Sequence, residues 1–475
     1  MLERITGLER LLVGRWSDDA VSAWAVDGAL VWPFLCHALN TVALEHLLLG
    51  KRTQIGTGRG RLALHAYRLF GERALVRRSS SGAAKLAGAW EDGDIVVFSS
   101  VSAVDPERGL HGLADPLRLA LRERGRSSRL LFVDADGARP LALPGARGVR
   151  SELAAIRRDA PRRRLAWPLP GAVELAGALG PLLAVPVGSI LAWMTRLLDN
   201  FVAYRGVLAG RFAAHRPAAI VLTDHGDAFA AAVCAVARAA GVPVYCLQHG
   251  ALRRADPEHP DHPFPDAHHD VLPQTHLLWR RERLGRNGIA FGPPRLQLAL
   301  GDEAADAAVA APPTGGGRPV VVAAPQVVGD LAPIMALIRG LGPVHCIWRP
   351  HPFLSAAGRA QVEAAAHAAG TSFAVDHGPL AFSLLVADML VTGYSAAALE
   401  AATLGVPTVF MSPYARWLYD GQIDPELVRH ANGPETAPEL AATAAPSERL
   451  AAFRTDYGGL PGRAADAILA ARSGA

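Results

Sequence analysis

Short apolar runs that end in a turn and lead into a helical pattern recur along most of this chain. The first clear run is GDIVVFSS, where four β-branched or aromatic residues at 95–98 follow a Gly-Asp turn and predict a buried strand. A helix is predicted over about Pro116–Arg124, with Gly125 ending it, and a second strand over Arg129–Asp134. Strand, helix and strand with short connections predict a parallel sheet.

The same alternation returns after a long segment, about Arg150–Arg211, that is expected to be helical. AAIVLTD (Ala218–Asp224) predicts a strand, Ala228–Ala240 a helix ended by Gly241, and VPVYCLQHG (Val242–Gly250) another strand. THLLW and IAFGPP predict two further short strands. This half of the chain therefore reads as one parallel α/β sheet.

A second alternating run begins at Arg318. It predicts strands in RPVVVAAP, VHCIWRPHP, SFAV, DMLVTG and VPTVF. Between them it predicts helices near residues 331–341, 356–369 and 396–404 and a short helix that ends at Ala387. The expected fold class is α/β, with two Rossmann-like parallel-sheet domains that face a cleft. The expected domains are a helical N-terminal extension (1–90), an N-terminal Rossmann-like domain (91–300), a flexible linker containing APPTGGG (301–317) and a C-terminal Rossmann-like domain (318–475).

Composition supports two domains and limits the partners. The chain has 475 residues, and a single hydrophobic core rarely grows past about 250–300. A net charge of +4 suits an anionic substrate or an anionic membrane surface but is too small to indicate nucleic acid. The four cysteines form no C-x-x-C pair, and the first residues lack the order of a signal peptide, so a cytoplasmic protein with buried thiols is expected.

One uncharged stretch, Leu175–Met194, has the length that can span a bilayer. Glycines and prolines interrupt it, and predicted strands lie on both sides, so an internal helix pair is the preferred interpretation. Peripheral contact with the inner membrane face stays open, because the basic run Arg157–Arg164 lies just upstream.

The segment from Asp388 to Phe410 carries the strongest chemical signal. In GYSAAALEAATLGVPTVF, Gly393 allows a tight turn and Ser395 is predicted to cap a helix that begins at Ala396. The unpaired amides and positive dipole end of such a helix favour phosphate, and Glu400 would reach a sugar or ribose hydroxyl. The alternative is that Ser395 only caps the helix and Glu400 is solvated.

Arg349 and His351 follow a buried strand in CIWRPHP. The two prolines restrict the backbone, so both side chains have defined directions. A guanidinium and an imidazole at the end of a strand suit recognition of a diphosphate or nucleotide. A rigid surface loop is the alternative.

Two further strand ends, TDHGD and CLQHG, supply candidates for a base that deprotonates an acceptor hydroxyl. Asp224, Asp227 and His249 are the predicted catalytic residues, and His225 and Gln248 are predicted on the acceptor side. Each histidine has a structural alternative, because a lone histidine is more often a core residue.

The loop rich in histidine and aspartate has the residue types of a metal site, but their spacing is irregular and broken by proline. No metal and no cofactor are therefore expected, and the loop is interpreted as mobile. Its residues are His259, His262, His268, His269, Asp256, Asp261, Asp266 and Asp270.

At these residues the chain resembles the GT-B superfamily of bacterial surface polysaccharide synthesis. QHG, RPHP and GYSAAALEAATLGVPTVF occur in the order found there, over about residues 215–412. The likeness is greatest to surface carbohydrate (capsule or O-antigen) biosynthesis proteins related to poly(glycerol phosphate) transferases. It implies a metal-independent glycosyltransferase with a nucleotide-sugar donor and a glycan or lipid-linked acceptor. By this likeness Arg349, His351, Ser395 and Glu400 would hold the nucleotide, and Asp224 or His249 would face the acceptor.

The chain departs from its teichoic acid relatives in two motifs. Those transferases carry T-D-Y-S-S where this chain has Thr392–Ala396, and W-H-G where it has Gln248–Gly250. A CDP-glycerol-type polyol phosphotransferase, a CMP-linked donor, and a catalytically silent or epimerase-like relative remain as alternatives.

Overall fold

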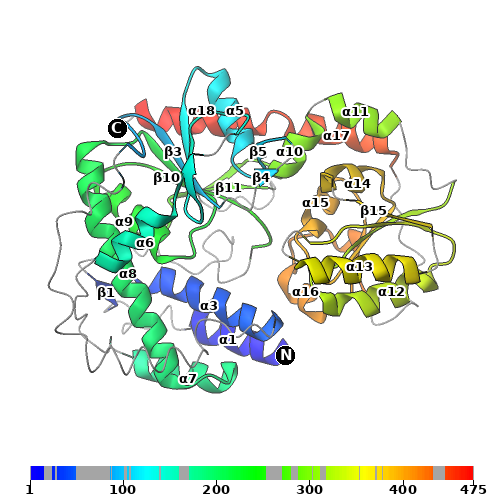
Figure 1. Cartoon of the computed structure of the whole chain (residues 1–475), viewed down its shortest axis with the longest axis horizontal. Coiled ribbons are helices and arrows are strands. Elements are labelled where there is room, and N and C mark those ends of the chain that lie inside the picture. Colours follow the sequence, from blue (N-terminus) through cyan, green and yellow to red (C-terminus); the bar gives the residue numbers. More distant parts are fainter. Residues whose placement is uncertain are drawn as a thin grey trace. The chain divides into compact units, whose positions relative to one another are not determined.

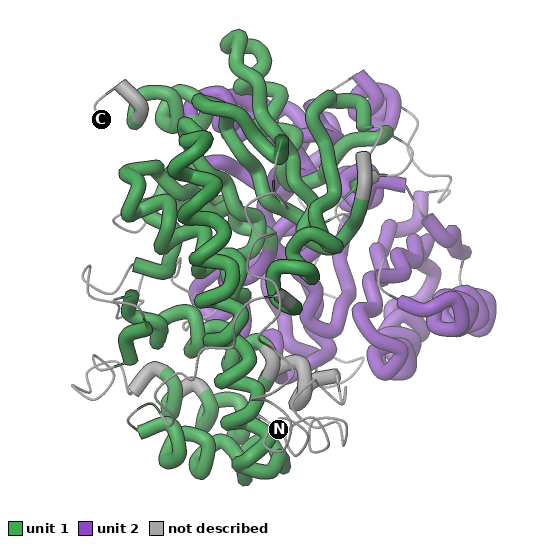
Figure 2. Tube along the Cα trace, turned by 60° about the vertical axis from the view of Figure 1, so that its left-hand side comes forward, with its two compact units in different colours: residues 1–249, 254–290, 464–475 green, residues 250–253, 291–463 purple. Residues whose placement is uncertain are grey.

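The computed structural model divides the chain into two compact units (Figures 1 and 2). Unit 1 comprises Met1–His249, Arg254–Ala290 and Ala464–Ala475, and unit 2 comprises Gly250–Arg253 and Phe291–Arg463. The residues that the structure describes are 2–14, 24–26, 29–49, 86, 88–100, 104–105, 108–138, 141–159, 169, 171–252, 270–279, 287–301, 303–310, 317–351, 354–369, 372–376, 378–431 and 444–473.

The sheet of unit 1 has the order β12-β11-β10-β9-β3-β6-β8-β7. All neighbours are parallel except β7 and β8. Numbered along the chain, six of the parallel strands lie in the order 3-2-1-4-5-6, which is that of a Rossmann sheet. The strands are β3 (Ile95–Ser99), β6 (Ser128–Phe132), β7 (Asp136–Ala138), β8 (Ala146–Val149), β9 (Ala219–Leu222), β10 (Val244–Leu247), β11 (Thr275–Leu278) and β12 (Gly288–Ala290).

Helices cover this sheet because their apolar residues face it. In α9 (Ala228–Ala239) ten consecutive residues are buried, since the helix packs both on β10 and on α8 (Val187–Ala214). Alanine on both sides of α9 permits this close double packing. The other elements here are β4 (Val104–Asp105), β5 (Leu110–His111), α5 (Asp115–Glu123) and α6 (Arg150–Asp159).

The predicted N-terminal helical region is present and belongs to unit 1. It contains α1 (Leu2–Gly14), the strand pair β1 (Ala25–Val26) and β2 (Ala29–Leu30), and α3 (Trp32–Leu49). Phe34 of α3 stacks on Phe201 of α8 with ring centroids 5.6 Å apart. The helices therefore share the core of the first Rossmann unit.

The uncharged stretch forms a bent helix pair, α7 (Ala172–Leu183) and α8, as the preferred interpretation predicted. The two axes bend by 119° at the break between them. Within the described residues no single helix is long and apolar enough to cross a bilayer, whereas this bent pair meets the same length and composition test when taken together.

Unit 2 also contains a parallel sheet in Rossmann order, β15-β14-β13-β16-β17-β18. Alternate residues of its central strands, such as Val321, Cys346 and Val391, pack with α12 and α13 in one core cluster. Helices α14 and α15 contact β13 and β16 from the other face (Figure 1). The strands are β13 (Val320–Ala324), β14 (His345–Trp348), β15 (Ser372–Val375), β16 (Met389–Thr392), β17 (Thr408–Phe410) and β18 (Val428–His430). The helices are α10 (Pro294–Leu300), η6 (Val328–Asp330), α12 (Leu331–Gly340), α13 (Ala356–Ala368), α14 (Leu380–Val386), α15 (Ala397–Thr403), α16 (Pro413–Leu418), η7 (Pro425–Leu427) and α17 (Pro446–Tyr457). Helix α18 (Leu460–Ser473) begins in unit 2 and belongs to unit 1 from Ala464 onward.

Two Rossmann-like parallel sheets were predicted, and both are confirmed. The flexible linker over 301–317 is wrong in its first half, where the structure has a helix, α11 (Glu303–Ala310). Five of the eight residues of α11 are alanine, the strongest helix former, and this outweighs the neighbouring Pro-Gly composition. The chain passes from unit 1 to unit 2 before α10, and the C-terminal segment from Ala464 belongs to unit 1.

Candidate functional site

Each sheet has a switch point, where the strand order reverses and where ligands of open α/β sheets bind. In unit 1 it lies between β3 and β9, and in unit 2 between β13 and β16. The predicted site residues follow the carboxyl ends of strands at or beside these two points.

In unit 1, Asp224 comes two residues after β9 and forms a tight turn with Gly226. Its Oδ1 accepts the Gly226 amide at 2.9 Å. The surrounding protein disfavours the charged form, but nearby His249, the Gly226 amide, and then His225 and His37 hold the pKa of Asp224 below its ordinary value. Asp224 is therefore an ionised carboxylate among imidazoles, and its side chain is exposed, as is that of His249.

His225 and Gln248, which were predicted on the acceptor side, are both buried. They are 4% and 7% exposed. The Nδ1 of His225 lies 3.3 Å from the Sγ of Cys246, and the Oε1 of Gln248 accepts the Trp279 amide at 2.8 Å. His225 follows the exposed Asp224, and Gln248 precedes the exposed His249. Because successive side chains of an extended chain point to opposite sides, His225 and Gln248 point inward.

Asp227 is the N-cap of α9, where its Oδ1 accepts the Ala230 amide at 2.8 Å. Desolvation by the surrounding protein, with repulsion from Asp224, raises the pKa of Asp227 to about 6. One of its oxygens is thus committed to the helix. Of the three predicted catalytic residues, Asp224 and His249 are the exposed side chains without a capping role.

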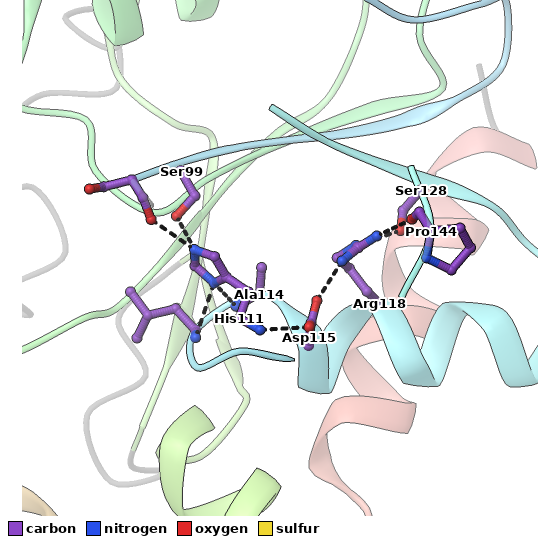
Figure 3. Close-up of polar contacts among 9 residues, drawn as sticks. Ser99, His111, Ala114, Asp115, Arg118, Ser128 and Pro144 are labelled. Atoms are coloured by element: carbon purple, nitrogen blue, oxygen red, sulfur yellow. Dashed lines mark hydrogen bonds and ion pairs between the residues drawn. The ribbon is translucent and has the colours of Figure 1, made fainter. Parts of the chain in front are cut away.

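A buried polar network at the end of β3 reaches Thr223, the residue between β9 and Asp224. Figure 3 shows the part of this network around His111. The Ser99 hydroxyl lies 2.9 Å from Nε2 of His111 and 2.7 Å from the Thr223 hydroxyl. The Nδ1 of His111 accepts two backbone amides, so the proton is assigned to Nε2. Burial lowers the pKa of His111, which therefore stays neutral.

The network does not form a nucleophilic triad. Asp115 accepts the backbone amide of His111 at 2.7 Å and pairs with Arg118, but it does not touch the imidazole (Figure 3). The side chains of His111, Asp115 and Arg118 are all buried. We assign the network a structural role, which is to fix Thr223 and hence the start of the Asp224 turn.

In unit 2, Arg349 does lie at the end of β14, but its guanidinium already has partners. It pairs with Asp376 at 2.8 Å and donates to the Gly378 carbonyl at 2.5 Å. Burial lowers the pKa of Arg349, and Asp376 opposes that shift. Burial by itself would raise the pKa of Asp376. Hydrogen bonds from Ser383 and the Gly378 amide, together with the positive charge of Arg349, hold that pKa below its ordinary value. Asp376 was missed, although it follows the SFAV strand as Arg349 follows its own strand.

Gly393 is required for a reason that the sequence did not indicate. A Cβ at this position would lie 2.6 Å from both carboxylate oxygens of Asp330. Asp330 in turn accepts the amides of Gln326 and Val327 at 2.9 and 3.1 Å, which closes the loop after β13. Gly393 therefore joins the two strand ends of the switch point.

A row of unpaired amides was expected in the turn after Gly393, but most amides of this turn have hydrogen-bond partners. Helix α15 begins at Ala397, whose amide is 3.3 Å from the Ser395 hydroxyl, and the Ala398 amide bonds to the Ser395 carbonyl. Ser395 thus does hold the helix start, one residue outside the predicted cap. From Ser395 to Leu399, the Ala396 amide is the one without a hydrogen bond to any described residue.

Glu400 is 4% exposed, so the solvated alternative is wrong. Among the described residues, no hydrogen bond or ion pair reaches its carboxylate. Burial raises the pKa of Glu400, and the more distant positive charges of Arg295 and Arg349 oppose that shift. A largely buried carboxylate without a hydrogen-bond donor from the protein is uncommon, and its oxygens stay available to an outside donor.

The strand end that contains His249 continues into unit 2. Gly250 packs on Ala396, with a Cβ at 250 placed 3.8 Å from that of Ala396. The side chain of Gln422 accepts the Leu252 amide at 2.8 Å and donates to the Leu252 carbonyl at 2.6 Å. His249 is therefore joined by one peptide bond to a segment that is anchored at the start of α15.

Two other predictions bear on the site. His351 is half-buried after β14, and its carbonyl accepts the Leu354 amide. Of the histidine-rich loop, only Asp270 lies within the described residues. Within the described part of the chain, no group of three histidine, cysteine or acidic residues could hold a metal ion.

No family model and no curated protein matches the chain. Solved structures that resemble it include UDP-GlcNAc 2-epimerase from Neisseria meningitidis bound to UDP-GlcNAc (12% identity, 81% of this chain and 100% of that chain, TM-score 0.43). Others are the wall teichoic acid polymerase TagF (11%, 88% and 98%, TM-score 0.43) and the glycosyltransferase SnogD from Streptomyces nogalater (14%, 80% and 99%, TM-score 0.42). The fold assignment itself rests on the strand order of the two sheets.

Proposed function

We propose that this chain is a glycosyltransferase that moves a sugar from a nucleotide-activated donor to a bacterial surface polysaccharide or a lipid-linked acceptor. The observation that carries the proposal is the buried side chain of Glu400, whose carboxylate has no hydrogen bond to any described residue, beside the switch point of a Rossmann-order sheet. In such sheets an acidic residue accepts hydrogen bonds from the ribose hydroxyls of a nucleotide. A ribose diol would supply the donors that Glu400 lacks.

The donor phosphates fit the same end of the sheet. The Ala396 amide is free of other partners in the described chain, and Arg349 supplies a positive charge at the neighbouring strand end. Backbone amides and a guanidinium together stabilise an anionic leaving group without a metal. Asp376 holds the Arg349 guanidinium in place, and His351 follows it by two residues.

Unit 1 supplies the base in this proposal. Asp224 is ionised and exposed, and His249 is the largest attractive influence on its charge. Asp224, directly or through His249, takes the proton of the acceptor hydroxyl. The acceptor oxygen then bonds to the sugar C1, the bond from C1 to the phosphate oxygen breaks, and the nucleotide leaves with that electron pair. Asp227 stays with α9 as its cap.

The first test measures donor binding by thermal shift with UDP-, GDP-, CMP- and CDP-linked donors, in EDTA because the proposal needs no metal. We expect one nucleotide class to raise the melting temperature of the native chain. Glu400→Gln should lose most of that rise, because an amide accepts ribose hydroxyls less well than a carboxylate. Glu363→Gln, at an exposed glutamate of α13, is the matched control and should keep it.

The second arm follows transfer with the donor found in the first. Asp224→Asn should lower the rate by about 10²–10⁴-fold, the usual contribution of a general base, while the thermal shift by the donor is retained. Sugar transfer releases a nucleoside diphosphate from a UDP-, GDP- or CDP-linked donor and CMP from a CMP-linked donor. Release of CMP from a CDP-linked donor marks the polyol phosphotransferase alternative. An equal thermal shift in Glu400→Gln and the native chain, or full activity of Asp224→Asn, contradicts the proposal.

A further inference from the structure

An N-terminal helix contributes a side chain to the Asp224 turn. His37 lies on the second turn of α3 and is 6% exposed. Its ring centroid is 4.6 Å from that of His225, with the two ring planes at 49°. The imidazole of His37 is also one of the groups whose proximity lowers the pKa of Asp224. A residue almost 190 positions away in the sequence thus packs against the candidate base.

The contact with Gly226 is closer still. A Cβ at Gly226 would lie 2.6 Å from both Cδ2 and Nε2 of His37 and 3.3 Å from the Oδ1 of Asp224. Gly226 does not have a positive φ, so its backbone does not require glycine. Glycine is needed because the His37 ring occupies the space that a side chain would fill. The same Gly226 donates its amide to Asp224.

We infer that His37 is a positioning residue for Asp224, an inference that rests on the proposed function of Asp224 as the base. The ring packs on Gly226, whose amide donates to the Asp224 carboxylate, so it confines the turn to the conformation that presents Asp224 beside His249. Helix α3 is itself fixed to unit 1 by the stacking of Phe34 on Phe201. The N-terminal helical region therefore packs against the turn that carries the proposed base.

The first experiment needs no substrate and follows hydrogen exchange of the amide at 226 by mass spectrometry. In His37→Ala that amide should exchange at least about 10-fold faster, because the turn opens locally, while the amides of α9 keep their native rates. His37→Phe keeps a ring against Gly226 and should restore slow exchange. Native exchange at 226 in a folded His37→Ala chain overturns the inference.

The second experiment is a double-mutant cycle on transfer kinetics. Gly226→Ala places its methyl group on the His37 ring, so it and His37→Ala should each lower kcat by about 10- to 100-fold without changing the KM for the donor. In the double variant the ring is gone, and the second substitution should add little. Losses that multiply, or a change confined to KM, overturn the inference.

Two features keep these tests decisive. Should His37→Ala fail to fold, Gly226→Ala carries both measurements, because it displaces the ring and leaves α3 intact. Gly210→Ala on α8 is the matched control, since a Cβ there meets nothing within 4 Å, and it should behave as the native chain. If no donor supports transfer in the native chain, the proposed function fails, whereas the exchange result still decides whether His37 holds the turn.

Discussion

At the scale of single residues, the buried Glu400 is expected to lower the stability of the folded chain and to take part in the proposed donor binding. An ionised carboxylate inside a protein is unfavourable unless donors or positive charges compensate it. Arg295 and Arg349 compensate in part, yet burial still raises the pKa of Glu400. Such a residue is expected where a ligand, and not the protein, completes the hydrogen bonds.

This cost predicts a pH-dependent stability. Because the folded pKa of Glu400 is raised above 4.5, the folded chain binds this proton more tightly than the unfolded chain does. The stability that Glu400 contributes is therefore present at low pH and is lost as pH rises through the folded pKa. The side chain at 400 in Glu400→Gln cannot titrate. The melting temperature of this variant minus that of the native chain should therefore be larger at pH 8 than at pH 4.5, by about 2 °C or more.

Thermal melts across that range check the prediction, with Glu363→Gln as the exposed control. A difference between Glu400→Gln and the native chain that does not change with pH would show that the carboxylate is compensated by groups of the protein. The same variant is expected to bind the donor less well. Near neutral pH, Glu400→Gln should thus be more stable relative to the native chain than it is at low pH, and it should bind the donor less tightly.

Several residues of the candidate site could not be found from the sequence, because their partners are far away along the chain. His37 packs on Gly226, and Asp330 packs on Gly393. Either glycine could be interpreted as a turn residue until the contact is seen. Asp376 was within reach of sequence reasoning, since the rule that selected Arg349 applies equally to the next strand end.

At the scale of elements, the buried strands were predictable because each is a short β-branched run between turn signals. Their carboxyl ends therefore marked where the site residues lie. The direction of each side chain was harder to predict. Thr223 and His225 point inward and Asp224 outward, and Gln248 is buried while His249 is exposed. That alternation depends on how the chain leaves the strand, which periodicity within the strand does not determine.

The segment after β10 gives the prediction at this scale. Gln422 is 6% exposed and satisfies both the amide and the carbonyl of Leu252. Gln422→Ala should lower the free energy of unfolding by about 1–3 kcal/mol, because two buried backbone groups lose their partner. It should also speed the exchange of the Leu252 amide.

Denaturant melts and hydrogen exchange measure these two effects. Gln361→Ala, at an exposed glutamine of α13, is the control and should stay within about 0.5 kcal/mol of the native chain. If Gln422→Ala is as stable as this control, the segment after His249 is held by other contacts.

At the scale of the whole molecule, chain connectivity was harder to predict than fold class. Two parallel sheets follow from the alternation of strands and helices, and the helical N-terminal region follows from its composition. The chain nevertheless crosses from one unit to the other at 249/250, 253/254, 290/291 and 463/464. These crossings depend on packing such as that of Gly250 on Ala396, and no composition signal marks them.

The bent pair α7 and α8 carries a surface feature of the same scale. Among the described residues the exposed large hydrophobic side chains are Val173, Val187 and Val328, and the first two lie on this pair. Near its bend, Gly177, Pro181 and further small apolar residues are also exposed. We predict that this surface contacts the interfacial region of a bilayer, as the proposed transfer to a lipid-linked acceptor would require.

Co-sedimentation with vesicles of phosphatidylethanolamine and phosphatidylglycerol tests this contact. A chain with Val173→Asp and Val187→Asp should bind at least about 10-fold more weakly, because each valine that enters the interface contributes about 1.5 kcal/mol. Val328→Asp, which removes the exposed valine of unit 2, is the matched control and should bind as the native chain does. Equal binding by all three would show that charge alone attracts the chain, and high salt would then release it. Persistent binding of the native chain in high salt, together with loss in the double variant, assigns the contact to the α7–α8 bend.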